Sequence, residues 1–152
     1  FTFGTQLHNI SPQLGIKDPD AALAAIGQHV QDWEGGTRIA ASLGAFNRDW
    51  ARRVLSTPAV VLLISDGLER SGLAALDGEM SRLALQAREL IWLNPLLRWE
   101  QFSPPAAGIK AMLPHVSSLV ACHNLSSLED LSDHLNGRRM IDHKARLLRL
   151  LE

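Results

Sequence analysis

Two short stretches of the sequence place hydroxyl and carboxylate groups where they could bind a cation. Asp66 comes directly after a long apolar run, with Ser65 before it, Gly67 after it and Glu69 close by. Thr37 follows two glycines at the start of a second apolar pattern. Hydroxyl and carboxylate oxygens are hard ligands of the kind that Mg²⁺ and Mn²⁺ prefer. Thr37 and Asp66 are therefore candidate metal ligands, with Ser65, Gly67 and Glu69 as their neighbours.

The same residues also have a purely structural interpretation. Asp-Gly is a common turn, and threonine is a common residue at the N-cap of a helix, the position that we predict for Thr37. Other signatures of enzymes are missing from the sequence. It contains no G-x-G-x-x-G, no G-x-S-x-G, and no Lys-Ser/Thr after the glycine spacing of Gly67 to Gly72. Cys122 lies on a predicted strand, where we expect it to be a small buried apolar residue.

An enzymatic alternative stays open at this point. Asp66 and Glu69 lie on one predicted loop, and two carboxylates after a parallel strand could position Mg²⁺ and a base. The alternative function is therefore a Mg²⁺-dependent hydrolase or transferase that acts on phosphoryl or acyl groups.

Apolar patterns predict the elements that position these residues. The runs Ala59–Ile64 and Leu90–Leu93 do not alternate with polar residues, so we expect two strands covered on both faces. We expect the end of a strand at Phe1–Gly4, followed by a loop up to Pro19. A weaker strand is expected at Val116–Cys122. Helical periodicity predicts apolar stripes at Leu23, Ile26, Val30 and Trp33; at Ile39, Leu43, Phe46, Trp50 and Val54; at Leu73, Leu76, Met80, Leu83 and Ala87; from Ala107 to Leu113; and at Leu128, Leu131 and Leu135.

Strands that alternate with helices predict an α/β fold with an open, doubly wound, Rossmann-like and mainly parallel sheet, with helices on both of its faces. In such sheets, ligands bind beyond the carboxyl ends of the strands. The loops that should carry the chemistry are Gly4-Thr5, Asp66-Gly67, Asn94-Pro95 and His123-Asn124.

Composition restricts the class of protein further. The 152 residues suffice for one core, the single cysteine excludes a disulfide framework, and the net charge of −1 argues against a nucleic-acid binder. No apolar run reaches the roughly 18 residues that a membrane span needs, and we expect a cytoplasmic protein.

Residues 137–152 carry five basic and two acidic side chains, a net charge of +3. We predict a main domain over 1–136 and a basic amphipathic helix over 137–152, with an apolar stripe at Met140, Ile141, Leu147, Leu148 and Leu151. That helix either docks on its own domain or binds a partner or a membrane surface.

Four segments occur in one order along the chain: Phe1-Thr2-Phe3-Gly4-Thr5, Gly35-Gly36-Thr37-Arg38-Ile39, Leu63-Ile64-Ser65-Asp66-Gly67 and Ile91-Trp92-Leu93-Asn94-Pro95-Leu96. Together they resemble the von Willebrand factor A (VWA) domain of the CoxE-like family, over Phe1 to about Leu135. The family consists of bacterial proteins often associated with maturation of molybdenum-containing carbon monoxide dehydrogenase and related enzymes.

The resemblance implies a metal-ion-dependent adhesion site at the carboxyl edge of the sheet. It assigns Thr37 and Asp66 as ligands of a divalent cation, directly or through water, and a carboxylate of a partner protein completes the shell. The family's Asp-x-Ser-x-Ser motif, which supplies three further ligating side chains, does not occur in these 152 residues. The resemblance places it before Phe1, on the first central strand. We therefore expect a carboxyl-terminal part of a longer protein that binds Mg²⁺ weakly or not at all.

The resemblance also implies a function and partners. The chain would be a non-enzymatic, metal-ion-dependent protein-interaction domain, acting with a MoxR-type AAA+ ATPase on a molybdenum metalloenzyme client such as carbon monoxide dehydrogenase. Without the first central strand, the strands at Phe1 and at Ala59–Ile64 would each expose an unpaired edge. Such edges favour pairing with another chain, including a second copy of this one.

Overall fold

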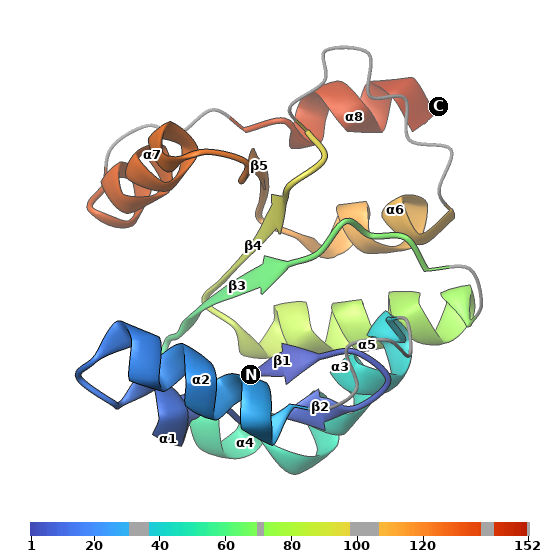
Figure 1. Ribbon diagram of the computed structural model, residues 1–152. Helices are drawn as coiled ribbons and strands as arrows, with labels where there is room; N and C mark the ends of the chain where they lie inside the picture. The colour runs from blue at the N-terminus through green and yellow to red at the C-terminus, as the bar shows by residue number, and fades with distance from the viewer. Residues whose placement is uncertain (31–36, 70–71, 98–106, 138–141, 152) are drawn as a thin grey trace.

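A parallel sheet of three strands lies at the centre of the fold (Figure 1). The structure is a computed structural model and describes residues 1–30, 37–69, 72–97, 107–137 and 142–151. The strands follow the order β3-β4-β5, with bounds Val60–Ile64 for β3, Glu89–Asn94 for β4 and Ser118–Ala121 for β5. Leu63 pairs with Trp92 and Trp92 with Leu119, so Trp92 lies on the middle strand with a neighbour on each side.

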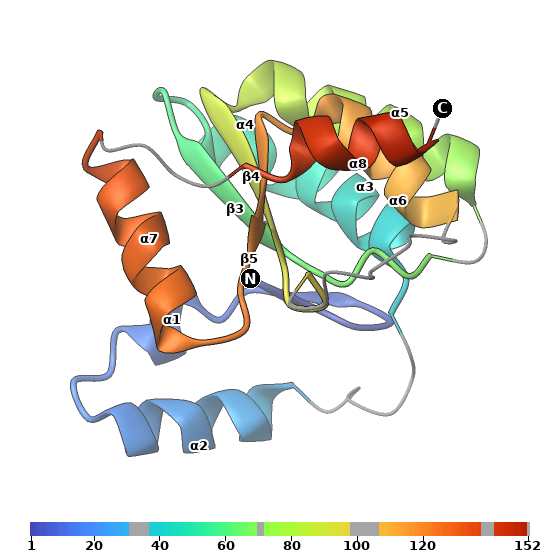
Figure 2. The same cartoon turned by 90° about the horizontal axis from the view of Figure 1, so that it is seen from above.

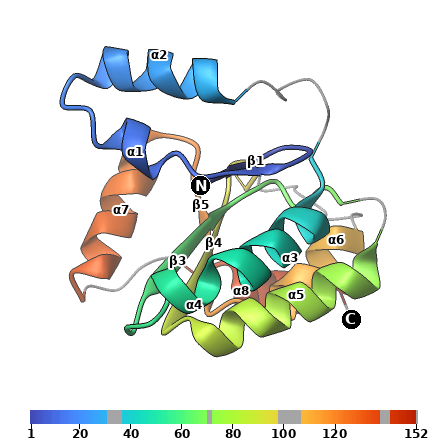
Figure 3. The ribbon, with the colours of Figure 1, turned by 90° about the horizontal axis from the view of Figure 1, so that it is seen from below.

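Helices cover both faces of this sheet. Figure 2 shows α7 on one side and α3, α5 and α6 on the other, and Figure 3 shows α3, α4 and α5 side by side beneath β3 and β4. This arrangement confirms the predicted α/β fold class. The helices are α1 (Ser11–Leu14), α2 (Pro19–His29), α3 (Ile39–Asp49), α4 (Ala51–Val54), α5 (Leu73–Gln86), α6 (Ala107–Met112), the 3-10 helix η1 (Leu113–His115), α7 (Leu125–Leu135) and α8 (Lys144–Leu151).

The core is divided in two by the sheet. Successive residues of a strand point to opposite faces, so Leu90 and Trp92 enter the larger cluster while Ile91 and Leu93 enter the smaller one. These β4 residues are all buried, which confirms the prediction of a strand covered on both faces. The larger cluster also contains Ile39, Leu43, Leu63, Leu76, Met80, Leu83, Ile109, Met112, Leu113, Val116, Leu119 and Leu147.

The prediction that Ala59–Ile64 is covered on both faces is wrong. Leu63 is 5% exposed, but Leu62 is 41% exposed and Ile64 is 58% exposed. Within the described residues β3 pairs with β4 alone, so it is an edge strand. The smaller core cluster is built on β4, β5 and α7, and it reaches β3 only at the half-buried Val60.

The amino-terminal segment departs from the predicted loop. β1 (Thr2–Phe3) lies within the strand predicted at Phe1–Gly4 and pairs antiparallel with β2 (Leu7–His8) along one edge, and β2 lies in the predicted loop. A helix, α1, follows within the same predicted loop. The two-residue strand β2 and the four-residue helix α1 are too short to show a periodic pattern, which explains why the sequence does not predict them.

Helix α2 packs on α1 through a small cluster of Ile10, Ile26 and Val30. Leu23, which the predicted stripe includes, is 67% exposed, so that assignment is wrong. The helix uses Ala22 and Ile26 as its buried positions instead. Trp33 of the same predicted stripe lies outside the described residues.

The predicted helix from Ile39 to Val54 is two helices. The backbone leaves helical geometry at Trp50, whose φ is −124°, between α3 and α4. Thr37 is not the N-cap of α3, because Arg38 takes that position and makes no side-chain capping bond. The N-cap residue thus supplies no side-chain acceptor for the free N–H groups in the first turn of α3.

Helix α8 packs against β5 and η1, and its Leu147 belongs to the larger core cluster. Asp142 fixes the start of this helix, because its Oδ1 accepts hydrogen bonds of 2.9 Å from the N–H groups of both Leu119 and Lys144. Met140 and Ile141 of the predicted stripe lie outside the described residues. In the described part of the chain, every helix is too short or too polar to cross a membrane.

Candidate functional site

Three of the predicted site residues border the same hollow at the carboxyl edge of the sheet. Thr37, Ser65 and Asp66 lie on its wall, although Thr37 is nearly thirty positions before the other two. The hollow has a volume of about 480 Å³. Gly67 and Glu69 are not among the described residues that line it. Its remaining lining residues are apolar apart from Thr2: Phe1, Phe3, Leu62, Ile64 and Pro95.

The Ser65–Asp66 turn is built by its own side chains. Ser65 Oγ accepts a hydrogen bond of 3.0 Å from the N–H of Gly67, and Asp66 Oδ1 accepts one of 3.0 Å from the N–H of Leu68. Both are two-residue contacts of the kind that Asx and Ser turns use. Among the described residues, no donor bonds to Oδ2 of the half-buried Asp66. One oxygen of this carboxylate thus shapes the turn, and the other has no donor in the part of the chain that the structure describes.

Strand β4 holds the backbone of this turn from the side. The indole Nε1–H of Trp92 donates to the carbonyl of Ser65 over 2.9 Å, and the amide Nδ2–H of Asn94 donates to the carbonyl of Asp66 over 3.2 Å. Trp92 is fully buried and Asn94 is 1% exposed, so both donors have fixed positions. Sequence reasoning assigned Trp92 to a strand and Asn94 to a loop, and it missed their contacts with the turn.

Two glycines let the chain pack tightly behind the turn. Gly67 has a φ of +75°, and a Cβ on it would lie 2.6 Å from Cζ2 of Trp92. Gly108, in the first turn of α6, faces the same segment, where a Cβ would collide with the carbonyl oxygen of Gly67 and lie 2.9 Å from the nitrogen of Glu69. Glycine is required at both positions, at Gly67 for its backbone conformation as well as for space.

Further hydrogen bonds join the loops along this edge. The N–H of Arg38 donates to the carbonyl of Gly4 over 2.9 Å, which connects the loop after β1 with the segment of Thr37. The N–H of Ala40 donates to Oε2 of Glu69 over 3.3 Å, which connects the start of α3 with the Asp66 turn. Two of the four predicted loops, Gly4-Thr5 and His123-Asn124, are not among the described residues that line the hollow. Asn124 caps α7, in a reciprocal capping box with Ser127.

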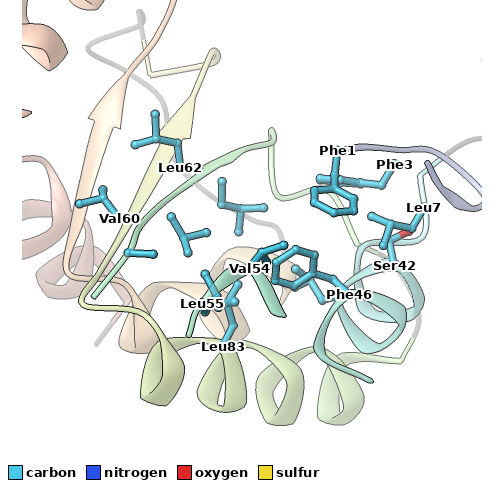
Figure 4. Close-up of a pocket in the computed structure, with 14 residues that line it drawn as sticks. Phe1, Phe3, Leu7, Ser42, Phe46, Val54, Leu55, Val60, Leu62 and Leu83 are labelled. Atoms are coloured by element: carbon cyan, nitrogen blue, oxygen red, sulfur yellow. The ribbon is translucent and has the colours of Figure 1, made fainter. Parts of the chain in front are cut away.

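A second hollow, of about 300 Å³, runs beside the first and is almost entirely apolar (Figure 4). β3 forms one wall of it, and the other residues around it include Phe1, directly before β1, Phe46 of α3 and Leu83 of α5. Among the described residues that line it, Ser42 alone carries a side-chain oxygen. This apolar hollow therefore suits hydrocarbon side chains rather than an ion.

The side chains that line the first hollow include the types of ligand that a divalent cation prefers, but too few of them. Thr37 and Ser65 offer hydroxyls and Asp66 offers a carboxylate, all of them ligands that suit Mg²⁺. Within the described residues, however, no group of three or more His, Cys, Asp or Glu side chains is placed to hold a metal. A cation held there would take its remaining ligands from water and from another molecule.

The parallel sheet, the helices on both of its faces and the oxygen-bearing loops at its carboxyl edge define a Rossmann-like α/β domain of VWA type. The sequence model of the family described as VWA domain containing CoxE-like protein matches residues 1–128. The chain belongs to this family. The match includes both Thr37 and Asp66 and ends inside α7. No curated protein and no solved structure matches the chain.

Proposed function

We propose that this chain is a non-enzymatic protein-interaction domain whose hollow at Thr37 and Asp66 uses a divalent cation, Mg²⁺ or Mn²⁺, for docking. Membership of the VWA family supports the interaction role. The proposal of a bound cation rests on one observation, which is that Thr37, Ser65 and Asp66 line the same hollow. In this proposal, the ion supplies the positive charge to which a carboxylate of the partner binds.

The chain's own residues prepare this hollow before a partner arrives. Oδ1 of Asp66 accepts the hydrogen bond from the N–H of Leu68, so the proposal assigns Oδ2 to the ion. Trp92 and Asn94 hold the backbone on either side of that carboxylate. Because these groups need little rearrangement, binding loses little free energy to ordering.

The proposal extends to partners through the family. The partner would be a MoxR-type AAA+ ATPase in the bacterial cytoplasm, and the client a molybdenum metalloenzyme such as carbon monoxide dehydrogenase. Purified ATPase and this chain should co-elute in the presence of Mg²⁺ and separate after the ion is chelated. Co-elution that survives chelation would argue against an ion-dependent contact.

A titration with Mn²⁺ up to millimolar concentrations, with electron paramagnetic resonance as the readout of bound ion, tests the site itself. We expect Asp66→Ala to lower the affinity about tenfold or more, and Thr37→Val to lower it less. Asp18→Ala is the matched control, because Asp18 Oδ1 accepts a 3.0 Å bond from the N–H of Asp20, the same two-residue contact as in Asp66, away from the hollow. Equal affinity in the Asp66 and Asp18 variants would remove Asp66 from the site.

The geometry gives the enzymatic alternative no support. A hydrolase or transferase of the kind considered would need Asp66 and Glu69 to face one substrate. Glu69 instead directs its carboxylate to the N–H of Ala40 and is not among the described residues that line the hollow.

A further inference from the structure

Glu69 stands out because it is a carboxylate in the interior. It is 8% exposed, and glutamate is almost never buried unless a partner compensates its charge. Its Oε2 accepts the hydrogen bond of 3.3 Å from the N–H of Ala40. Ala40 lies in the first turn of α3, where backbone N–H groups are free and the helix dipole favours negative charge.

This contact replaces a cap that the helix lacks locally. Arg38 occupies the N-cap of α3 without a side-chain capping bond. Glu69 supplies an acceptor from 29 positions further along the chain. The side chain that satisfies the start of α3 thus comes from the turn that carries Asp66.

The other end of the contact is equally constrained. The N–H of Glu69 donates to the carbonyl of Gly67 over 3.0 Å, and Gly108 packs against the Glu69 backbone and Cβ. The backbone of Glu69 is therefore held to the turn. A displacement of the turn would in turn release the start of α3, which lies two residues after Thr37.

We infer that Glu69 is a positioning residue, whose buried carboxylate ties the start of α3 to the Asp66 turn and so sets the spacing between Thr37 and Asp66. The inference rests on the proposed function, since that spacing matters for a cation held between the two side chains. It goes further by assigning the control of the site to a residue that does not line the hollow.

Three variants separate positioning from mere stabilisation. Glu69→Leu keeps the apolar bulk and removes the acceptor, whereas Glu69→Gln keeps an acceptor oxygen and removes the charge. Glu79→Leu is the matched control, because Glu79 Oε2 accepts a 2.7 Å bond from Asn47 further along the same helix. If Glu69→Leu does not fold, Glu69→Ala removes the acceptor without adding a branched side chain.

The first measurement is amide hydrogen exchange at Ala40, which needs no metal. We expect Glu69→Leu to speed this exchange about tenfold, Glu69→Gln to change it less than about threefold, and Glu79→Leu to leave it unchanged. An unchanged exchange rate at Ala40 in Glu69→Leu would refute the tie.

The second measurement is the Mn²⁺ affinity of the same proteins. We expect a loss of about tenfold in Glu69→Leu that Glu69→Gln largely restores. If Glu69→Leu raised the exchange rate at Ala40 but kept the wild-type Mn²⁺ affinity, Glu69 would act only as a helix cap. That result would overturn the inference. The inference would also be overturned if Glu69→Gln lost as much Mn²⁺ affinity as Glu69→Leu while the Ala40 amide stayed protected from exchange. The charge of Glu69 would then act on the ion directly. Failure of Asp66→Ala to weaken binding would instead refute the proposed function and leave the tie itself standing on the exchange data.

Discussion

The indole of Trp92 is hydrogen-bonded to the carbonyl of Ser65, the residue before the candidate ligand Asp66. Trp92→Phe keeps most of the buried ring but leaves that carbonyl without its donor, which should cost about 1–3 kcal/mol of unfolding free energy. Urea denaturation measures the difference. The control is Trp50→Phe, because Trp50 is half-buried and its ring contacts Phe1 and Arg53. Equal losses in the two variants would mean that the bond to Ser65 contributes nothing.

Gly67 and Gly78 should respond to alanine in opposite directions. Alanine at Gly67 meets a φ of +75° and a Cβ contact of 2.6 Å with Trp92, so we expect a loss of about 2–4 kcal/mol. Gly78 lies on the exposed side of α5 with no atom within 4 Å of a Cβ, and alanine there should gain about 0.5–1 kcal/mol. Thermal denaturation followed by circular dichroism measures both. A stable Gly67→Ala protein would show that the turn can adopt another conformation.

Asp142 should matter for the attachment of α8 through hydrogen bonding rather than through charge. Asp142→Ala removes the acceptor of both Leu119 and Lys144, and we expect it to cost about 1–3 kcal/mol. Asp142→Asn keeps a carbonyl oxygen in place of Oδ1 and should cost less than about 1 kcal/mol. Chemical denaturation compares the two. The prediction fails if the asparagine variant loses as much as the alanine variant.

His143 should make stability depend on pH. Partial burial lowers the pKa of His143 below its ordinary value of 6.5; the charge of Arg146 lowers it further, while Asp142 opposes the shift. Because the unfolded chain then binds the proton more readily, protonation favours unfolding, and this contribution to stability falls as pH drops below about 6.5. The effect should be small, since water screens a half-buried charge.

The test compares the wild type with His143→Gln at pH 7.5 and pH 5.5. The wild type should lose more unfolding free energy between these two values than the variant, because all other titrating groups are common to both. Parallel losses in the two proteins would exclude His143 as the source.

The free edge of β3 should let chains pair. Leu62 and Ile64 add exposed apolar side chains to a strand that pairs on one side alone among the described residues, and such edges associate. We expect the mass from light scattering to rise with concentration and Ile64→Lys to reduce that rise. Leu85→Lys is the control, since Leu85 is 86% exposed on α5, away from the edge. A wild type that is monomeric at every concentration would contradict the prediction.

Sequence patterns predicted the fold best where a segment has neighbours on all sides. Leu90–Leu93 is apolar at each position, and β4 has a strand on either side and helices over both faces, so the pattern and the environment agree. Leu62 and Ile64 are as apolar, yet they face water. The apolar composition of a strand shows that its side chains favour burial, but it does not show which neighbouring element covers them.

The candidate ligands could be predicted because they follow an apolar run directly, as Asp66 does, or begin a periodic pattern, as Thr37 does. The residues that hold them could not. The bonds from Trp92 to Ser65 and from Ala40 to Glu69 join positions 27 and 29 apart, and no local pattern indicates such pairs. Thr37 was misplaced as the N-cap because its type is typical of that position, whereas the cap function comes from Glu69.

The close approach of Gly108 to the carbonyl of Gly67 has a consequence for how related sequences should vary. A side chain at 108 would push the turn toward the indole of Trp92, and a side chain at 67 would strike that indole directly. A side chain at 67 or 108 thus needs space that the neighbouring atoms occupy. Relatives that keep a tryptophan at 92 should keep glycine at both 67 and 108, and because a smaller residue at 92 would relieve the contact but not the φ of +75°, glycine should persist at 67 even there.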